Sequence, residues 1–190
     1  MSTPPAALST SPETSPPKIS TPETLAADRR RALILGALLM GAFLSSLEVT
    51  VVGTVMPTIV GKLGGMKLFA WVATTYILTS TVTVPLCGRL SDLYGRRPVI
   101  LGGMSLFMVG SLLCGLAWDI ESLIAFRALQ GIGAGALIPT SLVMVGDLYP
   151  PERRPWALSL FSLTWAVSAA LGPAVGALLV EVWSWRAAFM

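Results

Sequence analysis

Long apolar runs separated by short polar stretches dominate the chain. Five of these runs are each close to the roughly 20 residues that a helix needs to cross about 30 Å of hydrocarbon. They cover residues 33–57, 69–88, 98–117, 122–145 and 156–180, and a sixth begins at about Trp185. Because unpaired backbone groups are not tolerated in lipid, the pattern predicts an all-α membrane protein, a transmembrane helical bundle of about five helices plus the start of a sixth.

The residues before the first apolar run have a different composition. Residues 1–31 are rich in Ser, Thr and Pro, contain the near-repeats SPET and TPET, and end in Arg29-Arg30-Arg31. Such a segment has too little apolar surface to offset the entropy of ordering. We expect a disordered tail over residues 1–31 and, over 32–190, a bundle that is the truncated N-terminal part of a longer protein. Because more apolar runs follow, the first is predicted to be an uncleaved helix rather than a signal peptide.

Composition excludes most other classes of protein. With 54% hydrophobic and only 12% charged residues, the chain needs lipid as its solvent. Its basic residues form small clusters between apolar runs, which argues against nucleic acid as a partner. There is no His, and the two Cys are not in CxxC spacing, so no metal site or disulfide framework is predicted. No P-loop or nucleophile–base cluster suggests an enzyme, and no cofactor is expected.

The loops between the runs differ in charge in a way that predicts orientation. Eight Lys and Arg fall on one side, against three on the other. The first group is Arg29, Arg30, Arg31, Arg89, Arg96, Arg97, Arg153 and Arg154, and the second is Lys62, Lys67 and Arg186. By the positive-inside rule the N-terminus is cytoplasmic, in a multi-pass protein of the cell membrane.

Two charged residues lie well inside apolar runs. Glu48 is about 13 Å from the outer end of the first predicted helix and Arg127 about 9 Å from the same face, so the two could meet across the first and fourth helices. A charge at a helix centre costs roughly 2.5–3.5 kcal/mol, and pairing reduces that cost. One interpretation is a static ion pair. The other is a proton-titrating carboxylate, Glu48, tuned by Arg127 and Gln130, on which burial and the arginine act in opposite directions.

Small residues recur at helical spacing in two runs. Gly131 and Gly135 in the fourth, and Gly172 and Gly176 in the fifth, form GxxxG patterns that let two backbones approach closely. The stretch around Gly131 also imitates a dinucleotide-binding glycine motif, but no strand precedes it, so that interpretation is rejected.

The polar stretch between the second and third runs has a more specific combination of residues than a simple turn requires. Gly88 and Gly95 are predicted to bracket a ten-residue turn. Asp92 would then suit the positive end of the third helix, and Arg96 and Arg97 could bind anionic lipid or acidic groups.

These stretches resemble motifs of the major facilitator superfamily, in the same order along the chain. The matches are Gly88-x-Leu90-Ser-Asp92-x-x-Gly95-Arg96-Arg97 to motif A, Arg127-Ala-Leu-Gln130-Gly131-x-Gly133 to motif B, and Gly172-Pro173-x-x-Gly176 to motif C, the antiporter motif. The stretches around Glu48 and from Trp183 to Phe189 resemble segments of the fourteen-helix drug:proton antiporters. Glu48 stands where that branch has Asp, and Ser168 and Ala177 replace motif C glycines.

The resemblance implies a proton-coupled transporter that exports small amphipathic compounds by alternating access, with H⁺ as the coupling ion. Its partners would be the lipid bilayer, a small-molecule substrate and a C-terminal bundle outside this chain. Asp92 with Arg96 or Arg97 would form a latch to that bundle, and Pro173 would kink the fifth helix. Two alternatives stay open: a solute importer or facilitator of the same superfamily, and a non-transporting fragment.

Overall fold

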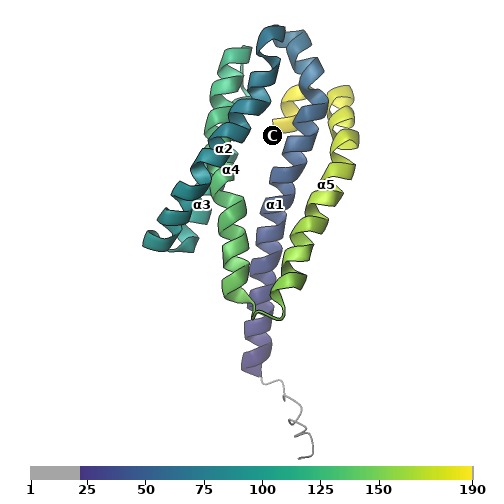
Figure 1. The fold of residues 1–190 in the computed structure, drawn as a ribbon. Helices are drawn as coiled ribbons and strands as arrows, with labels where there is room; N and C mark the ends of the chain where they lie inside the picture. Colours follow the sequence, from purple (N-terminus) through teal and green to yellow (C-terminus); the bar gives the residue numbers. More distant parts are fainter. Residues whose placement is uncertain (1–21, 190) are drawn as a thin grey trace, which may run out of the picture.

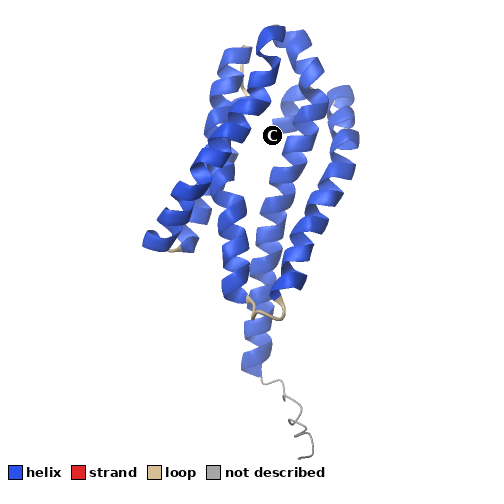
Figure 2. Cartoon of the chain, viewed as in Figure 1, coloured by secondary structure: helices blue, strands red, loops and turns tan. Residues whose placement is uncertain are grey.

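The computed structural model describes residues 22–189, which are almost entirely helical (Figures 1 and 2). The long helices are α1 (Pro22–Leu63), α2 (Phe69–Tyr94), α3 (Arg96–Gly115), α4 (Ile120–Leu148) and α5 (Arg154–Val182). Two short 3₁₀ helices, η1 (Met66–Leu68) and η2 (Trp185–Phe189), precede α2 and follow α5. All five long helices are long and apolar enough to cross a membrane. The described part thus has the predicted number of spanning helices, with η2 where a sixth was expected to begin.

The helices pack in two groups that η2 joins. α4 packs closely against both α2 and α3, while α1 runs along α5 (Figure 1). η2 contacts α1, α3 and α5. One apolar cluster surrounds η2 and includes Val51 and Trp185, and a second, which includes Ala42 and Phe161, lies toward the opposite end of α1. Glu48 therefore occupies a position on α1 between the two apolar clusters.

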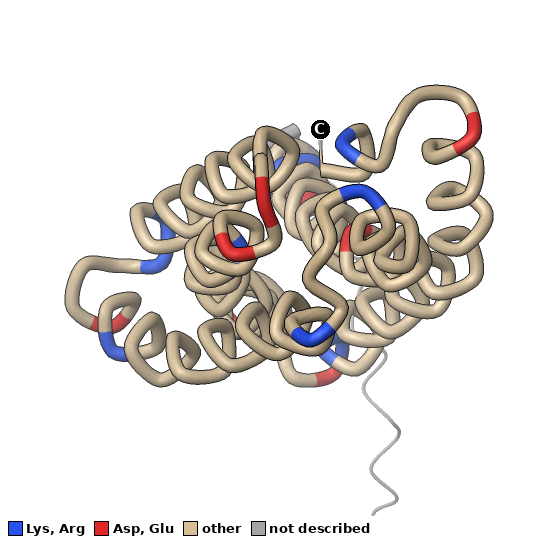
Figure 3. The backbone as a smooth tube through the Cα atoms, turned by 90° about the horizontal axis from the view of Figure 1, so that it is seen from above, with Lys and Arg blue, Asp and Glu red and all other residues tan. Residues whose placement is uncertain are grey.

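Charged residues are sparse along the helices (Figure 3). The beginning of α1, the α2–α3 connection and the α4–α5 connection lie at the same end of the bundle (Figure 1). These three places carry the eight basic residues that the sequence assigns to the cytoplasmic side. The basic residues, which fall in alternate loops along the sequence, therefore also lie at one end of the bundle in space.

The first helix begins earlier than predicted. Residues 22–31 were expected to belong to a disordered tail, but they form the first turns of α1, so that part of the prediction is wrong. Proline is well suited to the first helical position, because its missing N–H would have no intrahelical partner there. Arg31 and Asp28, three residues apart with Nη1 3.4 Å from Oδ1, give this extension a favourable surface pair. The remainder of the predicted tail, residues 1–21, lies outside the described residues.

The turn between α2 and α3 is much shorter than predicted. Instead of a ten-residue loop over Gly88–Arg97, α2 continues through Gly88 to Tyr94 and α3 begins at Arg96. Gly95 alone makes the break, with φ 87° and ψ 161°, a conformation that glycine adopts without steric cost. Asp92 is consequently in the last turn of α2, and the first turn of α3 itself carries no acidic residue.

The reversal between α3 and α4 is set by a capping box. The backbone N–H of Ser122 donates to Oδ1 of Asp119 at 2.7 Å, and the backbone N–H of Asp119 donates back to the Ser122 hydroxyl at 3.3 Å. Hydrogen bonding from Ser122, chiefly from its backbone N–H, stabilises the charged carboxylate and holds the pKa of Asp119 below its ordinary value. The start of α4, and hence the height of Arg127 two turns later, is fixed by this cap.

Candidate functional site

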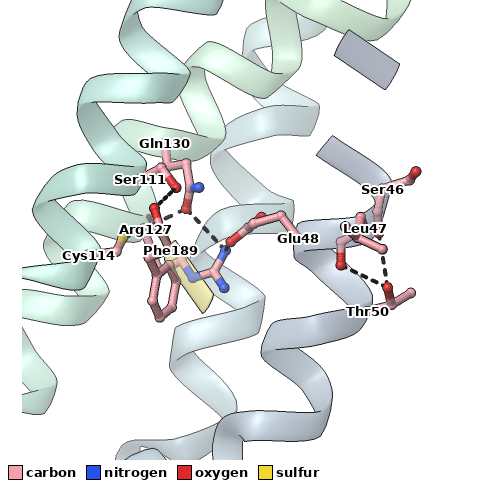
Figure 4. Close-up of polar contacts among 9 residues, drawn as sticks. All are labelled: Ser46, Leu47, Glu48, Thr50, Ser111, Cys114, Arg127, Gln130 and Phe189. Atoms are coloured by element: carbon pink, nitrogen blue, oxygen red, sulfur yellow. Dashed lines mark hydrogen bonds and ion pairs between the residues drawn. The ribbon is translucent and has the colours of Figure 1, made fainter. Parts of the chain in front are cut away.

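The structure brings together the two buried charges that sequence analysis singled out. Nη1 of Arg127 on α4 lies 2.8 Å from Oε1 of Glu48 on α1 (Figure 4). Their side chains are 3% and 8% exposed, respectively. A charge that is this little exposed is stabilised chiefly by its counter-charge. The two residues therefore form one electrostatic unit that joins α1 to α4.

The third predicted member of the site, Gln130, contacts Arg127. Nη1 of Arg127 donates to Oε1 of Gln130 at 3.1 Å, and the thiol of Cys114 on α3 approaches the same oxygen at 3.7 Å (Figure 4). Gln130 is completely buried. Its amide oxygen thus accepts from a residue of its own helix and from one on α3, which orients the side chain toward the guanidinium.

Hydrogen bonding at the site is incomplete. Among the described residues, neither carboxylate oxygen of Glu48 has a donor in hydrogen-bond geometry, and Nε of Arg127 and Nε2 of Gln130 have no acceptor. The Nη1–Oε1 contact is close enough for an ion pair, but the N–H is not aimed at the oxygen. The carboxylate is therefore held chiefly by charge, with little help from directed hydrogen bonds.

Two aromatic rings complete the surroundings of Arg127. Its Cζ lies 5.3 Å from the ring centroid of Tyr76 on α2 and 5.0 Å from that of Phe189 in η2. Neither ring was predicted to be a partner of Arg127. The rings come from segments distant in sequence, so spacing along the chain carries no signal for them.

A cavity of about 350 Å³ lies beside the pair. Its wall is mostly apolar and is formed by α1, α3, α4, α5 and η2, with Phe107, Val175 and Phe189 among the lining residues. Glu48 is the acidic residue in this lining. Glu48 therefore borders an open, low-polarity space within the bundle, while its two carboxylate oxygens are buried.

The seam between α1 and α5 contains the residues that resemble motif C: Gly172, Pro173 and Gly176. Within the seam, the Ser46 hydroxyl donates to Oγ of Ser168 at 2.7 Å, and the Thr50 hydroxyl donates to the Ser168 carbonyl at 3.2 Å. A Cβ on Gly172 would overlap the Thr50 hydroxyl. α5 continues through Pro173 without interruption. The small residues thus allow α1 and α5 to approach closely, two residues from Glu48.

The glycines of α4 pack against two neighbouring helices, α2 and α3. A Cβ on Gly131 would overlap the Thr79 hydroxyl of α2, whereas a Cβ on Gly133 would overlap the backbone nitrogen of Phe107 on α3. The alternation of glycines lets both helices pack against α4 at once. This packing places Arg127 and Gln130 between α2 and α3.

The motif A residues lie at the other end of the bundle. Nε of Arg96 is 2.5 Å from Oδ2 of Asp147 near the end of α4. Leu90, Asp92 and Arg97 are exposed, and none of the ion pairs among the described residues includes Asp92. The structure therefore pairs Arg96 with an α4 residue that sequence analysis did not consider and leaves Asp92 on the surface.

Comparison with known proteins agrees with this arrangement. The family model described as Major Facilitator Superfamily matches residues 38–190. The chain is 41% identical over 160 residues to the multidrug transporter protein MdtP of Bacillus subtilis, covering 84% of this chain and 30% of that protein. It is also 41% identical over 157 residues to multidrug resistance protein 3 of the same species, covering 83% and 30%.

A more distant relative and a solved structure agree. The efflux pump dotC of Dothistroma septosporum is 35% identical over 158 residues, covering 83% of this chain and 27% of the pump. A crystal structure of a bacterial homologue of the human lysosomal transporter Spinster, inward-facing and unoccupied, matches with a TM-score of 0.71 at 22% identity, over 80% of this chain and 32% of that one. The chain spans less than a third of the length of the sequence relatives. It has the fold of an N-terminal transporter bundle and belongs to the major facilitator superfamily.

Proposed function

We propose that the protein containing this bundle is a proton-coupled exporter of small amphipathic compounds that works by alternating access. The observation that carries the proposal is the buried contact between Glu48 and Arg127. Protonation of Glu48 would neutralise one partner and leave Arg127 as an uncompensated buried charge, which is costly in a low-dielectric interior. Proton binding would therefore favour a different arrangement of α1 against α4, and that coupling is what a proton-driven transporter requires.

The surroundings of the pair support this role. The glycine- and serine-lined seam ties α1 to α5 close to Glu48, whereas Arg127 belongs to the group formed by α2, α3 and α4. The ion pair is thus one of the links between the two helix groups. A change in its charge would be transmitted to packed helices rather than absorbed by a mobile loop.

The substrate class rests on the relatives. Two of the similar bacterial proteins are named as multidrug proteins, and a fungal one as an efflux pump. The complete substrate cavity of such a transporter would also need the C-terminal bundle. That bundle would pack against this one as a partner. We infer that the clustered arginines at one end of the bundle face the cytoplasm at the cell membrane, as the positive-inside rule predicts.

We also propose that Asp92, Arg96 and Arg97 act as a latch to the C-terminal bundle. The exposure of Asp92 and Arg97 supports this, because both side chains are free to reach a partner outside the described residues. The Arg96–Asp147 pair would connect the latch to α4, the helix that carries Arg127.

The test is transport by the full-length protein in liposomes under an imposed pH gradient. Glu48→Gln should abolish acceleration by the gradient while leaving membrane insertion intact, and Glu48→Asp, which keeps the titratable group, should retain it. Glu181→Gln makes the same chemical change at an exposed site on α5 and serves as the matched control.

The direction of movement distinguishes the alternatives. Extrusion coupled to proton entry supports the exporter, whereas accumulation of substrate along the proton gradient would identify an importer of the same superfamily. Proton coupling that survives in Glu48→Gln would refute the role assigned to this pair.

A further inference from the structure

Phe189 has a position that neither the motif resemblance nor the proposed function explains. The residue is 3% exposed, and the centroid of its ring lies 5.0 Å from Cζ of Arg127. Figure 4 shows the ring beside the guanidinium that contacts Glu48. An aromatic face at this distance attracts a cation, and the attraction is stronger where water is excluded. Phe189 therefore interacts with the charged partner of Glu48 although it comes from a separate element.

The ring of Phe189 is itself held in place. The hydroxyl of Ser111 on α3 donates to the Phe189 carbonyl at 2.7 Å. The ring meets that of Trp185 edge to face, with centroids 6.3 Å apart and an interplanar angle of 88°. Nη2 of Arg186 donates to the carbonyl of Ala117 at 2.9 Å and fixes the same segment to the connection between α3 and α4. The position of Phe189 is thus fixed by contacts of its backbone, its ring and its neighbouring residues.

Few other contacts determine where the Arg127 guanidinium lies. Its Nη1 serves both Gln130 and Glu48, and its Nε has no acceptor among the described residues. The rings of Phe189 and Tyr76 are therefore the further contacts that can orient it. A guanidinium that lost one ring could tilt away from the carboxylate, because no hydrogen bond to Glu48 restrains it.

The titratable groups that lie near Glu48 on neighbouring helices are few. α4 contributes Arg127, α2 contributes the phenol of Tyr76, and α3 contributes the thiol of Cys114. From α5 the contacts near Glu48 are neutral hydroxyl and backbone groups at Ser168. Within the described residues, Arg127 is thus the cation that can change the charge balance at Glu48, and its placement controls that balance.

We propose that Phe189 is a positioning residue for the Glu48–Arg127 pair: its ring holds the guanidinium against the carboxylate and so sets the proton concentration at which Glu48 exchanges its proton. This rests on the proposed proton coupling through Glu48. It also gives the segment that follows α5 a part in coupling, because any movement of η2 moves the ring that orients Arg127.

The experiment measures gradient-driven transport by the full-length protein across a pH series. In Phe189→Leu, which keeps an apolar side chain but removes the ring, the pH of half-maximal transport should rise by roughly half to one unit, the scale of one lost cation–π contact. Phe189→Tyr keeps the ring and should keep the parent profile. If Phe189→Leu is not produced in the membrane, Phe189→Met makes the same test.

Phe161→Leu is the matched control, since it removes a ring that is also buried but lies in the other apolar cluster. It should change the amount of folded protein and not the pH profile. A Phe189→Leu profile that superimposes on the parent, while Glu48→Gln has lost coupling, would overturn the role of Phe189 alone. Coupling that survives Glu48→Gln would overturn the proposed function and this role with it.

Discussion

Nε of Arg96, the first residue of α3, lies 2.5 Å from Oδ2 of Asp147 in the last turn of α4. The pair connects the turn that resembles motif A to the helix that carries the buried arginine. The two side chains are 31% and 52% exposed, so solvent screens their attraction. Surface pairs of this kind contribute about 0–1 kcal/mol.

We therefore expect Asp147→Asn to lower the free energy of unfolding by less than about 1 kcal/mol while changing the transport rate. Thermal unfolding in detergent gives the first quantity and liposome transport the second. A matched Glu152→Gln change, at an exposed acid in the α4–α5 connection, should affect neither. A large loss of stability in Asp147→Asn would mean that the pair is structural.

Asp92 provides a separate test of the proposed latch. Its side chain is exposed and takes part in none of the ion pairs among the described residues. Asp92→Asn should therefore leave the thermal stability of the bundle unchanged and still slow transport, because the lost contact would be with the C-terminal bundle. Normal transport rates in Asp92→Asn would show that the latch assignment is wrong.

Adjacent glycines in α3 allow a sharp test of helix packing. A Cβ on Gly103 would come 2.5 Å from the Cβ of Ala136 on α4, whereas a Cβ on Gly102 would meet nothing within 4 Å. Gly103→Ala should cost about 1–3 kcal/mol, because the helices must separate to admit the methyl group. Gly102→Ala, the matched control, should cost little or nothing. Equal thermal stability of the two variants in detergent would contradict the observed α3–α4 contact.

The buried pair has a stability consequence independent of transport. Arg127→Leu leaves the Glu48 carboxylate buried without its counter-charge, for which we expect a loss of about 3–5 kcal/mol. The double variant Glu48→Gln with Arg127→Leu should lose less than the single one, because no charge remains unpaired. A double-mutant cycle on unfolding free energies measures the coupling, and strict additivity would mean that the two residues do not interact.

The Asp119 cap predicts a pH dependence outside the membrane. Its carboxylate is stabilised by hydrogen bonds from Ser122, and its pKa is lowered in the folded state. The contribution of the ionised Asp119 cap to stability is therefore present above the ordinary pKa of the group, 3.8. It is lost as the pH falls through the lower pKa that Asp119 has in the folded state. Asn caps helices as well as Asp but does not titrate, so Asp119→Asn should flatten the acid limb of a thermal-stability profile. An unchanged acid limb would argue against the cap.

Several properties of the chain follow from local chemistry alone. The number of spanning helices follows from apolar runs of membrane length, since lipid leaves the backbone no other way to satisfy its polar groups. Glu48 and Arg127 stand out because charges in such runs are costly and hence few. Where local sequence analysis failed, it misjudged helix ends: Pro22 starts α1 ahead of the arginines, and Gly95 alone turns the chain between α2 and α3.

Tertiary structure decided which residues contact one another. Positions that face lipid and positions that face the core are both apolar in a membrane helix, so the apolar pattern does not reveal which side packs inward. The sequence therefore determined that this chain is a helical bundle with a buried acid and a buried arginine. Only packing in three dimensions brought Glu48 within 2.8 Å of Arg127 and laid the ring of Phe189 beside it, because those contacts join segments that are neighbours in space and not along the chain.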